Sequence, residues 1–160
     1  MEPPKDKKAF IIVIGDTGEF TKALEHYKPR QVINGERQYS WKFVRTEKAF
    51  YWILGETVQN ITRQFMNFVH PVIYLIINFK SSSYMESLEK GYKMVSDDLL
   101  EWRGNTRIRP TEIVVVGVNY DEKKGISKMK ENVLRWCVEQ KANLDDIIIS
   151  YVDLENWNEL

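Results

Sequence analysis

Four short runs of Ile, Val, Phe and Tyr, nearly free of charged side chains, most strongly constrain how this 160-residue chain can fold. A strand has a continuous apolar run, rather than an alternating one, when both faces of its sheet are covered. The runs are therefore typical of central strands in a parallel sheet. The four predicted strands are Ala9 to Ile14, Val72 to Phe79, Glu112 to Val118 and Asp146 to Val152.

A long helix is predicted between the second and third of these strands. Ser83 followed by Glu86 forms a capping-box pattern, and Gly104 stands where a C-terminal glycine is common. Apolar residues at steps of three and four place one stripe of this helix against a sheet. The stripe consists of Met85, Leu88, Tyr92, Val95, Leu99 and Trp102.

Two further helices follow from the same periodicity. One has Ser127 as its N-cap. It turns Met129, Val133, Trp136 and Cys137 toward the core. The other extends from about Glu56 to Val69 and stops at Pro71, because proline cannot continue a helix.

A hairpin is predicted from Gln38 to Leu54, since Tyr39, Trp41, Phe43 and Arg45 alternate with smaller or polar residues. Its second arm, Ala49 to Leu54, is apolar and is expected further inside the sheet. Strand, helix, hairpin and then alternating helices and strands predict an α/β fold with three layers. The expected sheet has six strands, mostly parallel, with one antiparallel edge strand.

Composition excludes several classes of protein. A lone cysteine, Cys137, cannot form an internal disulfide, and no Cys/His cluster has the spacing of zinc ligands. The 23 basic and 23 acidic residues cancel, which argues against nucleic acid as a partner. The longest apolar stretch, Pro71 to Phe79, is too short for a transmembrane helix of about 20 residues. We expect a flexible leader over residues 1–8 and a single cytoplasmic domain over 9–160.

The loop after the first strand carries the most informative motif, because ligands bind α/β sheets at the carboxyl ends of strands. Its sequence, Gly15 to Lys22, resembles without a gap the phosphate loop of the Ras-like small GTPase family, most closely its Rab-type members. Gly15, Asp16 and Gly18 match common family choices. However, Phe20 stands at the second glycine, Thr21 at the phosphate-binding lysine and Lys22 at the magnesium-binding hydroxyl. The resemblance implies a P-loop NTPase-like fold.

The other family motifs are altered as well. In place of the Trp-Asp-x-x-Gly element, Trp52 to Gly55 lacks the metal-linked aspartate, and Glu56 replaces the water-orienting glutamine. The segment corresponding to the first switch, Val32 to Gln38, contains no Ser or Thr that could sense the γ-phosphate. Three groups that the family uses for magnesium and hydrolysis therefore have no counterpart here.

The guanine-recognition motif, Asn-Lys-x-Asp in the family, can be placed in two registers. One keeps the base-reading carboxylate as Asp121, and the other keeps the asparagine as Asn119 with Tyr120 in place of lysine. The last family loop, Ser-Ala-Lys, falls on Ser150 and the two residues after it, which include no lysine. Weak base binding stays open in either register.

The resemblance thus implies a degenerate member, a pseudoGTPase, that needs no cofactor and is not an enzyme, or at most a very weak GTPase. The vestigial nucleotide site would comprise Gly15, Asp16, Thr17, Gly18, Phe20, Thr21, Lys22, Gly55, Glu56, Asn119, Asp121 and Ser150. The alternative is an atypical protein that binds GTP or GDP without a normal magnesium site, with Lys22 or a partner's arginine as the cation. No constellation of acid, base or nucleophile supports an unrelated α/β enzyme.

A GTPase-like module without catalysis would act by binding proteins in a larger assembly. Trp41 and Phe43 on the hairpin are candidate interface residues, because the family uses this region to contact effectors. The chain stops at Leu160, where the family's final helix would begin, so a partner or a longer chain is expected to cover one face of the sheet. Family members of this kind work in trafficking, in cilia and on the cytoskeleton.

Overall fold

The computed structural model describes residues 9–26, 31–34, 42–55, 72–103, 112–120, 125–140 and 147–155. The strands are β1 (Ala9–Gly15), β2 (Gln31–Asn34), β3 (Lys42–Arg45), β4 (Ala49–Gly55), β5 (Val72–Asn78), β6 (Glu112–Val118) and β7 (Ile147–Val152). The helices are α1 (Gly18–His26), α3 (Tyr84–Arg103) and α4 (Ile126–Gln140). Several expectations lie outside the described residues: the leader, the helix from Glu56 to Val69, the region after Glu155, and the residues Trp41, Glu56, Gly104 and Asp121.

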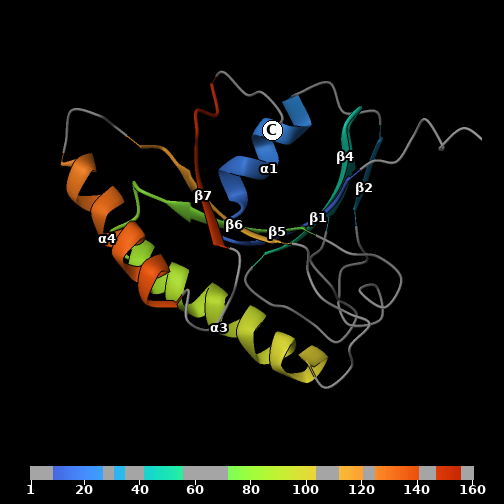
Figure 1. Ribbon diagram of the computed structural model, residues 1–160. Coiled ribbons are helices and arrows are strands. Elements are labelled where there is room, and N and C mark those ends of the chain that lie inside the picture. Colours follow the sequence, from blue (N-terminus) through green and yellow to red (C-terminus); the bar gives the residue numbers. More distant parts are fainter. Residues whose placement is uncertain are drawn as a thin grey trace, which may run out of the picture.

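All seven described strands form one sheet in the order β2-β3-β4-β1-β5-β6-β7. Strands β4, β1, β5, β6 and β7 pair in parallel, whereas β3 is antiparallel to both of its neighbours. Helix α1 covers one face of the sheet, and α3 and α4 cover the other (Figure 1). The predicted three-layer α/β fold with a mostly parallel sheet is therefore confirmed.

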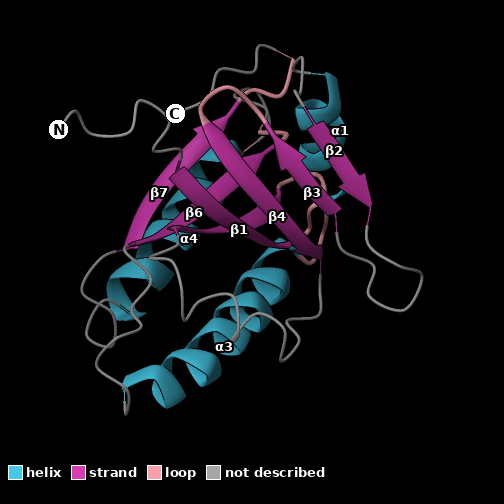
Figure 2. Cartoon of the chain, turned by 90° about the vertical axis from the view of Figure 1, so that its right-hand side faces the viewer, coloured by secondary structure: helices cyan, strands magenta, loops and turns pink. Residues whose placement is uncertain are grey.

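The sheet differs from the expectation at one edge. Strand β2 adds a seventh strand, so the antiparallel strand β3 lies second from the edge instead of at it, as Figure 2 shows. The sequence gives little sign of β2, because its four residues include only two apolar ones, Val32 and Ile33. Strand β2 owes its place to pairing with β3, where Val32 lies opposite Val44.

The predicted hairpin is present, and a buried threonine shapes its turn. Thr46 has none of its surface exposed. Its hydroxyl oxygen accepts hydrogen bonds from the backbone amides of Lys48 and Ala49, at 3.3 and 3.2 Å. The backbone amide of Thr46 donates to the Ala49 carbonyl at 2.9 Å. These bonds reverse the chain between β3 and β4, and β4 then lies inside the sheet beside β1, as the apolar second arm predicts.

The helical periodicities are also confirmed where side chains are described. On α3, Leu88 is fully buried and Tyr92 nearly so, and both pack in the core on the α3 face. On α4, Val133, Trp136 and Cys137 are buried in the same core. The rings of Tyr92 and Trp136 meet edge to face with their centroids 5.0 Å apart, which fixes the two helices against each other.

The opposite face of the sheet packs against α1. Phe20 and Leu24 are fully buried there and lie one helical turn apart. The ring of Phe20 contacts the rings of Tyr51 and Tyr74 edge to face. In each of these two pairs the ring centroids are 6.2 Å apart. Tyr51 belongs to β4 and Tyr74 to β5, so this aromatic cluster anchors α1 across three strands, with β1 in the middle.

Candidate functional site

The connection between β1 and α1 is short, and it decides what this end of the sheet can bind. Only Asp16 and Thr17 lie between the strand and the helix. The backbone amide of Asp16 donates to the carbonyl of Ile76 on β5, at 3.1 Å. Consequently the backbone turns directly into the helix.

Gly15 ends β1 with a φ of 93°, a conformation that side chains strongly disfavour. A Cβ atom at this position would lie 2.5 Å from the Ile76 carbonyl oxygen. Gly15 is therefore required by the close approach of β1 and β5, whether or not a phosphate binds. Gly18 differs, because a Cβ there would meet nothing within 4 Å.

The three altered phosphate-loop positions all lie within α1. Phe20 is fully buried against the sheet, at the position where the family has its second glycine. The hydroxyl of Thr21 donates to the backbone carbonyl of Thr17 at 2.7 Å, and the Thr21 amide donates to the same oxygen at 2.8 Å. Lys22 is exposed. These residues offer neither the glycine, the lysine nor the hydroxyl with which a P-loop holds a magnesium nucleotide, so the donor set does not fit that group.

Asn119 links three elements at the carboxyl edge of the sheet. It follows β6 directly and has a φ of 58°, in the left-handed region that asparagine tolerates. Its side-chain amide donates to the Asn78 side-chain oxygen at 3.1 Å and also to the carboxylate of Glu19 on α1. The same Asn78 oxygen accepts from the Lys80 amide at 2.9 Å. Asn119 thus connects the start of α1 with the ends of β5 and β6.

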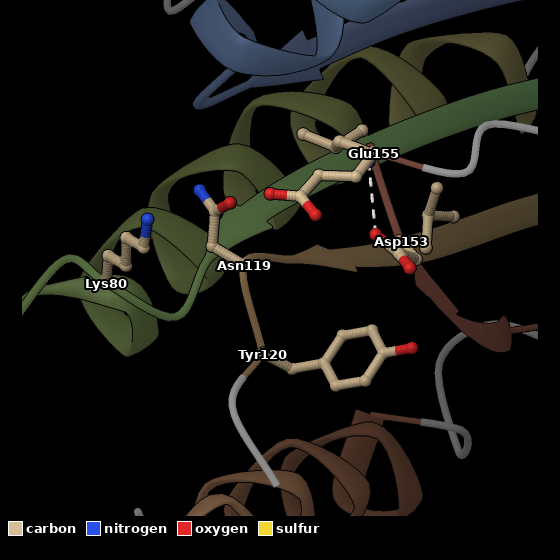
Figure 3. A pocket seen from close by; sticks show the side chains of 7 residues that line it. Lys80, Asn119, Tyr120, Asp153 and Glu155 are labelled. Carbon is tan, nitrogen blue, oxygen red and sulfur yellow. Dashed lines mark hydrogen bonds between the residues drawn. The ribbon is translucent and has the colours of Figure 1, made fainter.

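A pocket of about 290 Å³ opens beside Asn119 (Figure 3). It is lined by Lys80, Asn119, Tyr120, Val152, Asp153, Leu154 and Glu155. Sequence reasoning missed Lys80 and the residues from Asp153 to Glu155. The signal was available for Asp153, because it follows the last apolar residue of the predicted fourth run. Two carboxylates and one ammonium line this pocket.

The acidic wall of the pocket comes from the loop after β7. The backbone amide of Glu155 donates to a side-chain oxygen of Asp153 at 3.0 Å, so the loop turns back on itself. Figure 3 shows the Glu155 carboxylate directed toward Asn119. Ser150, in contrast, lies within β7 opposite Val116, two residues short of the loop.

Tyr120 joins the pocket to an aromatic group beneath it. The rings of Tyr120 and Tyr151 meet edge to face at 6.1 Å, and Tyr151 stacks on Phe79 at 5.9 Å. The Lys130 ammonium lies 4.8 Å from the centre of the Tyr120 ring and 4.5 Å from that of Tyr151. Burial raises the pKa of Tyr151 above its ordinary value, and the negative charge that Cys137 carries when it is ionised raises this pKa further. This group keeps Tyr120 in place at the pocket wall.

The remaining predicted site residues lie apart from this pocket or outside the described residues. Gly55 ends β4. Phe43 on β3 is partly exposed, and its ring lies 6.4 Å from that of Phe10 and 5.7 Å from that of Phe50. Within the described ranges, no three His, Cys, Asp or Glu side chains gather as metal ligands would.

Comparison with known proteins bears on the fold alone. No family model matches the chain, and no curated protein matches it. Among solved structures, the chain is similar to a crystal structure from Plasmodium falciparum described as a nucleolar GTP-binding protein 1. The two share 13% identity over 97% of this chain and 81% of that one, with a TM-score of 0.53. The chain therefore shares the three-layer α/β fold of that GTP-binding protein. None of its described helices is long and apolar enough to cross a membrane.

Proposed function

We propose that this chain is a degenerate GTPase-like domain of Rab type that does not hydrolyse GTP and works as a protein-binding module in a larger assembly. The observation that carries the proposal is the full burial of Phe20 where a P-loop has its second glycine. A glycine is needed there so that backbone amides can wrap the phosphates. Here that position is Phe20, whose side chain is buried in the core and whose backbone is part of helix α1.

The chemistry of phosphoryl transfer supports the same proposal. Enzymes of this class rely almost wholly on positioning and on charges held against the phosphates and magnesium. Here Thr21 supplies no positive charge, and Lys22 would repel the metal at the position of the magnesium-binding hydroxyl. Without these contacts to the phosphates and magnesium, the chain would have few groups that could accelerate phosphoryl transfer.

Protein partners, rather than nucleic acid, suit the chain's surface chemistry. The formal net charge is zero, so no overall positive field attracts a polyanion. Phe43, packed with Phe10 and Phe50 on the edge region of the sheet, offers a partly exposed aromatic surface. By resemblance to its family, the module would act in the cytoplasm, in trafficking or on cilia or the cytoskeleton.

Thermal unfolding with nucleotide tests the proposal. The purified chain is melted with 1 mM GTP, with GDP and without nucleotide, each with magnesium; those are roughly saturating conditions for a micromolar site. We expect the Tm to stay within about 1 °C, because a ligand that does not bind the native state cannot stabilise it. A rise of several degrees would overturn the proposal.

A second candidate is an atypical GTP- or GDP-binding switch without a normal magnesium site. It is favoured by the pocket at the ends of β6 and β7, the place where the family reads its base, with Asn119 at its wall. The exposed Lys22 would replace the missing cation. Chromatography of small molecules released by denaturing fresh protein tests it. Nucleotide in the wild type and its loss in Lys22→Ala would favour this candidate over the first.

A further inference from the structure

The neighbours of Asn119 determine which way its side-chain amide is turned. Its nitrogen donates to the carboxylate of Glu19 and, at 3.1 Å, to the side-chain oxygen of Asn78. An ionised carboxylate can only accept, and the Asn78 oxygen already accepts from the Lys80 amide, so a nitrogen must face both groups. The Asn119 side-chain oxygen is therefore turned away from them. No donor to this oxygen is found in the part of the chain that the structure describes.

A second acceptor faces this oxygen in the pocket. Figure 3 shows the Glu155 carboxylate and the Asn119 oxygen turned toward each other. Both residues line the cavity of about 290 Å³ at the ends of β6 and β7. Among the described residues, the Glu155 carboxylate has no hydrogen-bond or ion-pair partner. Two acceptors that face each other beside an open cavity can be joined only by a group that donates hydrogen bonds to both.

The charge of the lining favours a cation as this donor. Asp153 adds a second carboxylate to that of Glu155, whereas Lys80 supplies one positive charge. Figure 3 shows Lys80 beyond Asn119, on the side away from Glu155. Lys80 is exposed, so solvent and salt weaken its field at the two facing acceptors. A charged donor forms hydrogen bonds to a carboxylate that are roughly twice as strong as those between neutral groups.

The kind of cation follows from the groups that must hold it. A metal ion is disfavoured, because no three acidic, His or Cys side chains gather within the described ranges. A guanidinium is planar and carries several N–H donors, so it can reach an amide oxygen and a carboxylate at once, whereas an ammonium is a compact point charge. A guanidinium also packs well on aromatic rings, and the ring of Tyr120 lines the pocket. The Lys130 ammonium lies 4.8 Å from the centre of that ring, so the ring already attracts a cation.

We propose that the pocket at the ends of β6 and β7 binds a guanidinium group, which donates to the Asn119 oxygen and to the Glu155 carboxylate beside the ring of Tyr120. The inference goes beyond the proposed function, because neither the loss of hydrolysis nor a protein-binding role requires a ligand in this pocket. Two sources share this chemistry. One is an arginine side chain of another protein, and the other is the free amino acid, whose own carboxylate could pair with Lys80.

NMR titration of the isotopically labelled chain tests the proposal. N-acetylargininamide represents arginine within a protein and is compared with free arginine and with N-acetyllysinamide. We expect N-acetylargininamide to shift the Asn119 side-chain signals with a Kd of about 1 mM, as suits a ligand of about 15 non-hydrogen atoms. The lysine compound should bind roughly fivefold more weakly, because it lacks the planar set of donors. Tighter binding of N-acetylargininamide than of free arginine would assign the site to a protein's side chain, and the reverse order to the amino acid.

Replacing Glu155 tests the contact itself. Glu155→Gln removes the charge from an exposed loop residue without changing its size, so the fold should persist. The Kd for N-acetylargininamide should rise roughly fivefold, because a charged acceptor is lost. Glu139→Gln is the matched control, since Glu139 is an exposed glutamate on α4 that does not line the pocket. Its Kd should stay within about twofold of that of wild type.

Several results would overturn the inference. They are no saturable shift of the Asn119 signals up to about 10 mM N-acetylargininamide, equal affinity for the lysine compound, and an unchanged Kd in Glu155→Gln. Guanosine is titrated as well, because its base also presents N–H donors but carries no charge. Binding of guanosine without binding of the arginine compounds would replace the inference by base reading at this pocket. Melting with GTP tests the proposed function separately, so either proposal can fail without the other.

Discussion

Gly15 and Gly18 match the same family motif, yet the structure demands a glycine at only one of them. Gly15 has a positive φ and lies against the backbone of Ile76. Gly18 has open space around it at the start of α1. A glycine that matches a phosphate-loop pattern is therefore weak evidence for phosphate binding, because the packing of two strands can require a glycine by itself.

Replacing Gly15 by alanine tests this distinction. Strain at a positive φ costs about 1–3 kcal/mol, and the contact with the Ile76 carbonyl adds to it. We expect Gly15→Ala to lower the free energy of unfolding by at least that amount in urea titration. Gly18→Ala is the matched control and should change it by no more than about 0.5 kcal/mol. Equal losses in the two variants would contradict the structural reason given for Gly15.

At the scale of elements, the sequence allows the central strands, the hairpin, α3 and α4 to be predicted, because each has several apolar residues at the right period. Strand β2 could not be predicted, since its pairing with β3 supplies what its own four residues lack. The pocket was only half predicted. Asn119 could be found by motif, but the family comparison placed the last loop at Ser150, inside β7, and so missed Asp153 and Glu155.

The turn between β3 and β4 depends on one hydroxyl. In Thr46→Val, the buried amide of Ala49 loses its side-chain acceptor, which should cost about 1–3 kcal/mol of unfolding free energy. Thr46→Ser keeps the acceptor and loses one methyl group, about 1 kcal/mol. Urea titration of both variants measures the difference. A valine variant no less stable than the serine variant would contradict the role given to the hydroxyl in this turn.

At the scale of the whole molecule, the two faces of the sheet have separate cores. The core that faces α3 and α4 contains Cys137, whereas the core that faces α1 contains Phe20. Burial raises the pKa of the Cys137 thiol from its ordinary value of 9.0 to about 11. Because the pKa of this thiol is higher in the folded chain than in the unfolded chain, the free energy of unfolding of the domain depends on pH in the alkaline range.

The sign of this coupling follows from the two protonation states. Below pH 9 the thiol is protonated in both folded and unfolded chains, so stability is unaffected. Between about pH 9 and 11 only the unfolded chain releases the proton, which lowers the stability of the folded state. We expect unfolding free energies from urea titration to fall over this range more steeply in wild type than in Cys137→Ala. If the unfolding free energies of wild type and Cys137→Ala fell in parallel as the pH rises, this role of the Cys137 thiol would be contradicted.

The burial of Phe20 also limits how this sequence can evolve. A mutation to glycine at this position, the first step toward a phosphate-binding loop, would remove the ring that holds α1 to Tyr51 and Tyr74. Truncating a buried phenylalanine costs about 3–5 kcal/mol, a large share of the 5–15 kcal/mol by which a domain is usually stable. Because the gain from phosphate contacts would come only after further changes at Thr21 and Lys22, each intermediate sequence would fold poorly. The phenylalanine is thus entrenched, and a lineage carrying it would face a steep path to a loop with glycine at this position.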